Sequence, residues 1–291
     1  MSYNLCDYNE VNKILKKYGF TFSKAMGQNF LINPDVCPAM AQELGADEHT
    51  GVLEIGPGIG VLTKELCKVA GKVVAVELDK RLYPVLEDTL SECDNFELVC
   101  GDVMELDLSE IINTHFDGMT SVKVCANLPY YITSPIIMTL LESEFAIDEI
   151  VVMVQKEAAE RLCAEMGTRK AGAVTAAVRY YGVSEVLFEV GRESFMPSPK
   201  VDSAVIKITL SSSDEFEIED KKAFFALVRA AFSQRRKTLV NSLSSAMPYS
   251  KGDVTNALKK IGLSESVRAE KMTMEDFVAL TKILSEQADG K

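Results

Sequence analysis

Histidine is nearly absent from this 291-residue chain: His49 and His115 are the only two, and neither belongs to a recognisable cluster of metal ligands. A catalytic triad with histidine as its base is therefore not expected, and neither is a zinc site. The sequence predicts chemistry that needs no metal ion and no histidine base.

Cysteine pairs with the Cys-x-x-Cys spacing are also missing. The seven cysteines are scattered, and several lie in apolar stretches: Cys6, Cys37, Cys67, Cys93, Cys100, Cys125 and Cys163. Isolated cysteines of this kind are typical of buried free thiols in a reducing compartment rather than of disulfides or metal ligands. We therefore expect a cytoplasmic protein.

No apolar run approaches the roughly 18 residues that a membrane-spanning helix needs. Residues 1–17 are polar and mixed in charge, which predicts neither a signal peptide nor a transit peptide. With 47% hydrophobic residues, the chain can bury the core of one large domain or of two ordinary ones. A membrane partner is not expected.

The first 50 residues have the pattern of a helix, a loop and a second helix. Beyond them, short apolar runs alternate with helical patterns. These runs are 52–55, 73–76, 96–99, 122–126 and 150–154. Continuous apolarity within each run predicts strands of a parallel sheet covered on both faces.

Two further apolar runs, 183–190 and 204–210, are separated by a loop too short for a crossover helix, so they should pair antiparallel. The polar stretch 211–220 reads as a linker, and helical patterns dominate after it. We predict an α/β domain over residues 1–211, with an antiparallel edge strand, and a smaller all-helical domain over residues 212–291.

A glycine-rich loop, "EIGPGIG", follows the first of these strands and precedes a helix, with glycines at 56, 58 and 60. Glycine allows the backbone to turn sharply and to approach a ligand closely. Glu77 ends the next strand, where a carboxylate can accept both hydroxyls of a ribose, and Asp102 ends the third, where it can accept from an adenine amino group. Each acid could instead be a solvated loop residue, and the loop alone also fits a nicotinamide dehydrogenase.

The spacing G-x-G-x-G resembles the cofactor loop of class I S-adenosylmethionine-dependent methyltransferases. In that fold the methyl acceptor lies at the end of the fourth strand. Here that strand ends in "NLPY", residues 127–130, which resembles the signature of enzymes that methylate exocyclic amino groups of bases. On its own, this stretch also fits a strand end followed by a turn.

The residue types in "NLPY" suit that chemistry. The Asn127 side-chain oxygen and the Leu128 carbonyl can accept the two N–H bonds of an adenine amino group, which directs the nitrogen lone pair toward a methyl donor. Pro129 fixes the backbone that carries these acceptors. Tyr130 would stack on the base, and beside "NLPY" we expect Phe195 to cover its other face, whereas on its own Phe195 would fit a loop residue packed on the core. The target base must leave its stack to reach this site.

Motifs over nearly the whole chain resemble the bacterial small-subunit ribosomal RNA adenine dimethyltransferase family. They are "GQNFLIN", "LEIGPGIG", "AVELD", "GDVMELD", "ANLPYYITSP", "MVQKEAAERL", "SFMPSPKVDSAV" and "VRAAFSQRRKTL". The resemblance implies dimethylation of two adjacent adenosines near the 3' end of the RNA, in an immature small ribosomal subunit, by a monomeric enzyme. It also implies a set of cofactor-binding residues: Asn29, Leu31, Gly56, Gly58, Glu77, Leu78, Asp102, Val103 and Asn127.

Other functions remain open at this point. A large-subunit RNA adenine methyltransferase of the antibiotic-resistance type shares the catalytic core, and a non-catalytic assembly factor could keep the same fold. One departure from the family pattern is visible, because Ala171 precedes Gly172 where the family usually has tyrosine. Any contact made by that tyrosine is in doubt.

The net charge of −12 argues against a nucleic-acid partner, but the charge is unevenly spread. Residues 221–260 contain nine lysines and arginines and one acid, Asp253. A solvated helix face is the alternative interpretation, yet we expect this segment to contact RNA through Arg229, Arg235, Arg236 and Lys237. Arg235 falls within the apolar arc of the helical pattern, so we predict a helix break near Ser233, with Ser233 capping the next helix.

Overall fold

The computed structural model describes residues 3–23, 26–143, 147–211, 216 and 218–289. The chain divides into two compact units. The first contains residues Met1–Ala159 and Val183–Leu210, and the second contains Glu160–Gly182 and Ser211–Lys291. Residues 160–182, which the sequence pattern assigns to the first domain, thus group with the C-terminal helices. Of the predicted linker 211–220, residues 212–215 and 217 lie outside the described residues.

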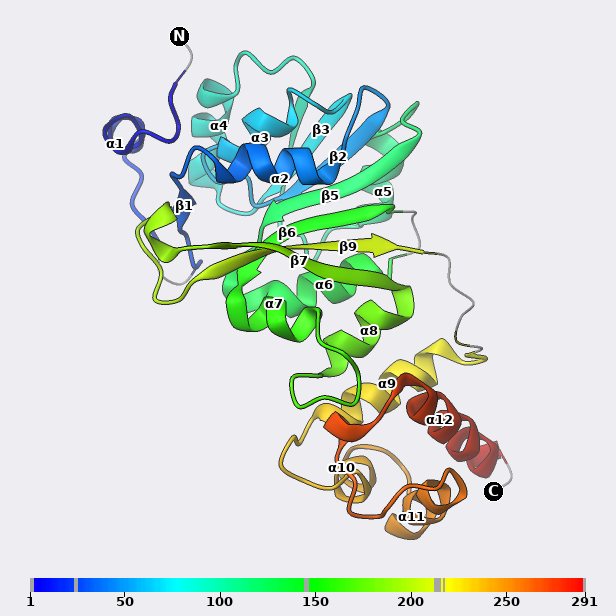
Figure 1. Cartoon of the computed structure of the whole chain (residues 1–291). Helices are drawn as coiled ribbons and strands as arrows, with labels where there is room; N and C mark the ends of the chain where they lie inside the picture. Colours follow the sequence, from blue (N-terminus) through cyan, green and yellow to red (C-terminus); the bar gives the residue numbers. More distant parts are fainter. Residues whose placement is uncertain (1–2, 24–25, 144–146, 212–215, 217, 290–291) are drawn as a thin grey trace. The chain divides into compact units, whose positions relative to one another are not determined.

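The first unit is built on a seven-stranded sheet with the order β4-β3-β2-β5-β6-β9-β7 (Figure 1). Its strands are β2 (Thr50–Ile55), β3 (Lys72–Glu77), β4 (Phe96–Cys100), β5 (Ser121–Asn127), β6 (Glu149–Gln155), β7 (Gly182–Val190) and β9 (Ser203–Leu210). Every apolar run predicted to be a strand forms one. Strands β2 to β6 pair in parallel, whereas β9 pairs antiparallel with β6 and lies one position in from the edge strand β7.

Helices cover both faces of this sheet, and Figure 1 shows α2 and α3 in front of it with α5 and α6 behind. The helices of the first unit are α1 (Tyr8–Lys17), α2 (Val36–Leu44), α3 (Val61–Leu66), α4 (Tyr83–Thr89), α5 (Leu108–His115) and α6 (Thr133–Leu141), with α7 (Lys156–Leu162) crossing into the second unit. Double coverage explains the strand sequences, because every residue of β2 is buried.

A second sheet of only two strands lies in the same unit. It pairs β1 (Phe30–Leu31) antiparallel with β8 (Phe195–Met196). Two residues are too few for a recognisable pattern, so the sequence did not predict these strands. Their pairing joins the N-terminal segment to the loop that contains Phe195.

The second unit is helical, with α8 (Ala173–Tyr181), α9 (Lys221–Phe232), α10 (Leu239–Ala246), α11 (Lys251–Lys260) and α12 (Met274–Asp289). Helix α8 packs on α9 through four aromatic rings, and the Tyr181 and Phe225 rings stack 5.7 Å apart at an angle of 5°. Phe224 and Phe277 are fully buried in this unit. Among the described residues, no helix of either unit is long and apolar enough to cross a membrane.

Helix α9 ends at Phe232, so the predicted break near Ser233 is confirmed. An unbroken helix would direct Arg235 into the apolar face, whereas in the turn Arg235 is exposed. The predicted cap is wrong, however. Ser233 closes α9 by donating to the carbonyl of Ala230, and Thr238 is the residue that caps α10. Thr238 has the extended backbone that an N-cap needs, whereas Ser233 is still helical.

We expect the Thr238→Ala substitution to destabilise the second unit by about 1 kcal/mol, because it removes the side-chain cap of α10. The matched Ser233→Ala substitution should change stability by less than roughly 0.5 kcal/mol. Urea unfolding of both variants, with amide exchange of α10, measures the difference. A larger loss for Ser233→Ala would contradict the assignment of the cap.

Candidate active site

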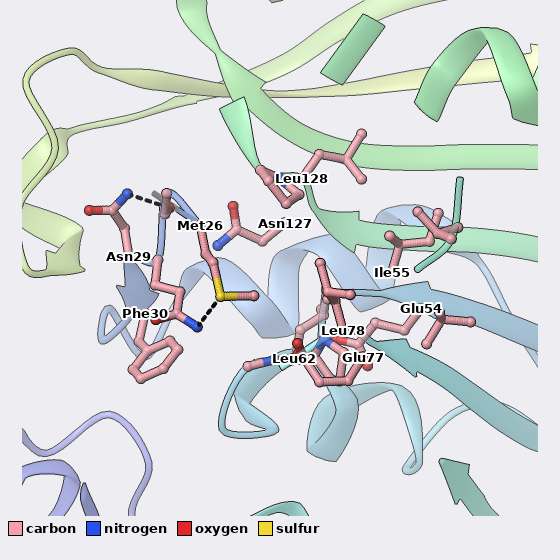
Figure 2. Close-up of a pocket in the computed structure, with 18 of the residues that line it drawn as sticks. Met26, Asn29, Phe30, Glu54, Ile55, Leu62, Glu77, Leu78, Asn127 and Leu128 are labelled. Carbon is pink, nitrogen blue, oxygen red and sulfur yellow. Dashed lines mark hydrogen bonds between the residues drawn. The ribbon is translucent and has the colours of Figure 1, made fainter. Parts of the chain in front are cut away.

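A cavity opens at the carboxyl ends of four neighbouring strands of the large sheet. Since β4, β3, β2 and β5 are parallel and in register, the residues that follow them emerge on one edge. The empty space at this site, including the part that is open to solvent, is about 1110 Å³. Figure 2 shows side chains from the strand ends and from the N-terminal segment around it.

All nine predicted cofactor-binding residues line this single cavity: Asn29, Leu31, Gly56, Gly58, Glu77, Leu78, Asp102, Val103 and Asn127. They come from five separate stretches of the chain. The structure therefore places in one cavity a set of residues that only the family resemblance predicted as a complete set.

The three loop glycines have positive φ values of 70°, 62° and 89°, a region that favours glycine. Their surroundings differ. A Cβ on Gly58 would lie 3.2 Å from Phe30, and one on Gly60 would lie 2.9 Å from Leu90. Nothing lies within 4 Å of a Cβ built on Gly56. Gly58 and Gly60 thus allow close packing of the loop, whereas the backbone at Gly56 is open to a ligand.

Glu77 is 6% exposed, and its carboxylate accepts two backbone hydrogen bonds. Oε1 accepts from the N–H of Asp79 at 2.8 Å, and Oε2 accepts from that of Gly58 at 3.3 Å. Burial raises the pKa of Glu77, while these two N–H groups oppose the shift. Hydroxyl donors from a ligand would stabilise the ionised carboxylate further.

Glu54 is a second acid in the wall of the cavity, near the end of β2 and 1% exposed. Burial raises its pKa to about 8, and the negative charge of Glu77 acts in the same direction. Within the part of the chain that the structure describes, its Oε2 atom has no hydrogen-bond partner. A buried acceptor left unpaired beside a cavity is available to a donor on a ligand.

The stretch 127–130 also lines the cavity. Asn127 ends β5, and the Leu128 N–H donates to the carbonyl of Met153 at 3.1 Å. The hydroxyl groups of Tyr130 and Ser203 are hydrogen-bonded at 2.7 Å, and Thr133 donates to the Pro129 carbonyl at 3.2 Å. These bonds fix the stretch in place before any substrate arrives. Burial also raises the pKa of Tyr130, so its ring carries a neutral hydroxyl.

Phe195 has a different environment from these residues. It is 3% exposed, belongs to the apolar core and pairs with Leu31 across β1 and β8. It is not among the residues that line the cavity. A role in stacking on a base therefore stays a prediction, and it requires the ring to become accessible when the substrate binds.

The four predicted RNA-contacting residues belong to the second unit, where all four are exposed. Arg229 lies on α9, and the other three lie in the turn between α9 and α10. Arg235 differs from its neighbours because its guanidinium donates to the carbonyls of Arg169 and Ala171 at 3.0 and 3.4 Å. It thereby holds the loop that contains the departure from the family pattern.

The sequence model of the family described as ribosomal RNA adenine dimethylase matches residues 19–286. The chain belongs to this family. It is 46% identical over 275 residues to ribosomal RNA small subunit methyltransferase A of Geobacillus thermodenitrificans, with 94% of each chain covered. The protein of the same name from Clostridioides difficile is 40% identical over 287 residues, covering 99% of each chain.

Solved structures agree with this membership of the dimethylase family. A dimethyladenosine transferase from Plasmodium falciparum superimposes with a TM-score of 0.71 at 26% identity, covering 89% of this chain and 98% of that one. The 23S rRNA methyltransferase ErmE has a TM-score of 0.63 at 25% identity, covering 88% and 100%. The predicted class I methyltransferase fold is thus confirmed.

Sequence reasoning missed three residues that organise the site of this dimethylase. Gln28 and Asp79 are hydrogen-bonded to each other at 2.7 Å, and Ser203 holds Tyr130. Gln28 and Asp79 both lie inside motifs that carry the family resemblance. Nothing in the sequence indicated that they meet, because 51 residues separate them.

The raised pKa of Glu54 predicts a pH-dependent stability for the ligand-free protein. The folded state keeps the proton up to about pH 8, whereas the unfolded chain releases it near pH 4.5. The stabilisation from this group is therefore complete below about pH 4.5 and is lost as the pH rises toward 8. We expect Glu54→Gln to remove this slope and to raise the free energy of unfolding at pH 7 by roughly 2–3 kcal/mol.

Urea unfolding at several pH values between 5 and 8 measures the slope in both proteins. Glu43→Gln, which changes an exposed acid, is the control. Parallel profiles for wild type and Glu54→Gln would show that Glu54 is ionised in the folded protein.

Proposed function

We propose that this protein methylates two adjacent adenosines near the 3' end of small-subunit ribosomal RNA, in an immature subunit and as a monomer. As a member of the dimethylase family, it is a ribosomal RNA adenine dimethyltransferase that uses S-adenosylmethionine. The observation that best supports methyl transfer to an amino group is the presence of Glu77 and Asn127 in one cavity, whereas the names of the relatives support the small subunit as the target. Glu77, which we expect to bind the cofactor, and Asn127, which we expect to accept a hydrogen bond from the adenine amino group, thus line the same cavity.

The residues of the cavity fit S-adenosylmethionine, whose sulfonium supplies an electrophilic methyl group when the cofactor is bound. Glu77 would accept from the ribose hydroxyls, and Asp102 would accept from the adenine amino group. The unpaired Oε2 of Glu54 and the open backbone at Gly56 suit the charged methionine portion. An ammonium beside Glu54 would favour the ionised carboxylate and offset the effect of its burial.

Asn127 and Leu128 would orient the adenine amino group. The Asn127 amide oxygen accepts one N–H and the Leu128 carbonyl accepts the other, so the nitrogen lone pair is directed away from the ring. No general base is needed at the start, because the nitrogen becomes acidic only after it has gained the methyl group. The hydrogen bonds that fix this stretch preorganise the acceptors.

Tyr130 would stack on the target base. Base stacking on an aromatic ring contributes about 1–3 kcal/mol. The bond from its hydroxyl to Ser203 holds the ring in place, so less conformational entropy is lost when the base arrives.

Two alternative functions are less well supported. The relatives at 40–46% identity are named as small-subunit enzymes, whereas the large-subunit enzyme ErmE is 25% identical. A non-catalytic assembly factor would have no need to keep Glu77, Asp102 and Asn127 around one cavity.

The function is tested by offering the protein radiolabelled S-adenosylmethionine with unmethylated small subunits, large subunits or naked RNA. We expect label on adenosines of the small subunit. The Asn127→Ala variant should lose at least roughly 100-fold in single-turnover rate while its cofactor affinity falls by less than about fivefold, because Asn127 orients the nucleophile. Label on large subunits, or near-wild-type turnover of the variant, would contradict the proposal.

The basic residues of the second unit are tested separately. We expect replacement of Arg229, Arg236 and Lys237 by alanine to weaken RNA binding at low salt. The slope of log affinity against log salt should fall by roughly 0.7–0.9 for each phosphate that the variant no longer neutralises. Arg235 is left intact because it binds backbone carbonyls within the protein.

A matched triple replacement of Lys251, Lys259 and Lys260 on α11 removes the same charge from exposed positions of the same unit. RNA binding is measured at several salt concentrations for both variants. Equal slopes would mean that only net charge matters, and they would contradict the assignment of the α9–α10 turn to phosphate binding.

A further inference from the structure

Residues 26–31 of the N-terminal segment form one wall of the cofactor cavity, and every one of them lines it. Figure 2 shows Met26, Asn29 and Phe30 on this side, facing the strand ends that carry Glu77 and Asn127. A cofactor inside the cavity is therefore covered by this segment. What holds the segment in place determines how readily the cofactor enters and leaves.

Asp79 binds this segment through Gln28. Asp79 is 6% exposed, and its Oδ2 accepts from Gln28 Nε2 at 2.7 Å and from the Arg81 guanidinium at 2.6 Å. Arg81 Nε donates to Oδ1 at 2.9 Å, and Arg81 also donates to the carbonyl of Thr21 at 3.1 Å. The carboxylate is thus charged and fixed, and it provides a strong acceptor for the Gln28 amide.

The backbone of Asp79 is bound to the cofactor side of the cavity. Its N–H donates to Oε1 of Glu77 at 2.8 Å. One residue therefore contacts both the acid expected to hold the ribose and the segment that covers it. A displacement of Gln28 would therefore change the position of Asp79, which is hydrogen-bonded to Glu77.

The far end of the segment is attached in a different way. Phe30 and Leu31 pair with β8, and the N–H of Ile32 donates to the carbonyl of Ser194 at 2.8 Å. Backbone pairing of this kind stays closed when a single side-chain bond breaks. The β1–β8 pair can therefore act as a hinge, and the Gln28–Asp79 bond as the latch.

We propose that Asp79 is a positioning residue that, through Gln28, holds residues 26–31 closed over the cofactor. This inference rests on the proposed cofactor site. The latch slows cofactor release rather than contributing to chemistry, because its bond joins residues 26–31 to Asp79 and does not involve the stretch 127–130.

The test measures release of radiolabelled S-adenosylhomocysteine from the full-length protein after a chase with excess unlabelled ligand. Gln28→Met keeps the side-chain length but removes both the donor to Asp79 and the acceptor of the Ser23 N–H at 2.9 Å. The dissociation rate should therefore rise about tenfold or more. Gln28→Lys restores a donor toward Asp79 and should return the rate to within about threefold of wild type. A role that depended on shape alone would not be rescued by lysine.

Asp88→Asn is the matched control. Asp88 accepts from Tyr3, Lys17 and Tyr18 at 2.7–2.9 Å and so fixes the N-terminal helix without lining the cavity. It should leave the release rate within about twofold. If Gln28→Met fails to fold, Asp79→Asn weakens the same bond from the other side and provides the same test.

The proposal is overturned if Gln28→Met releases the ligand no faster than Asp88→Asn, or if Gln28→Lys is as fast as Gln28→Met. A failure of the cofactor assignment has a different signature. In that case the wild-type protein itself would not bind S-adenosylhomocysteine, whatever the variants do.

Discussion

The register of the parallel sheet is the constraint on which the site depends. Ile55 pairs with Val76, and Glu77 pairs with Cys100, so the turns after these strands begin at the same level. Parallel strands place all their carboxyl ends on one edge, and a shift of one residue would turn Glu77 away from the cavity. Because both faces of the sheet are buried and the central strands are mostly apolar, the polar residues at the ends of the strands limit how far each strand can shift. The chemistry of the edge is therefore positioned by the packing of a core that takes no part in it.

This arrangement has an electrostatic cost. Glu54 and Glu77 are both buried, and burial raises the pKa of each. Backbone N–H groups from Gly58 and Asp79 offset part of this cost for Glu77, whereas Oε2 of Glu54 has no hydrogen-bond partner among the described residues. A ligand with hydroxyl and ammonium donors would satisfy both acids. The ligand-free pocket thus contains buried acids with too few hydrogen-bond donors. This favours binding of a polar, partly cationic cofactor over an apolar one.

Most of the fold could be predicted from the sequence, because its signals are local. The strands of the large sheet are mostly apolar runs, and the loop glycines follow directly after one of them. The two-residue strands β1 and β8 could not be predicted, since two residues show no periodicity and 163 residues lie between them along the chain. The cap of α10 was missed for a related reason. Ser233 and Thr238 are both good capping residues, and only the backbone conformation distinguishes them.

The parts of the site that could be predicted have local sequence signals, whereas the parts that could not depend on contacts between distant residues. Glu77, Asp102 and Asn127 were found because each lies at or just after the end of a strand, and strand ends can be located from the pattern alone. Gln28, Asp79 and Ser203 act through pairs that are distant in sequence, and only the folded chain brings them together. Arg235 shows a second kind of information that the sequence lacks, because a basic motif predicts RNA contact at every position, and only the folded chain shows that this side chain also binds two carbonyls of its own unit. Composition locates a charged surface, but a hydrogen-bond partner determines which of its residues are available to a ligand.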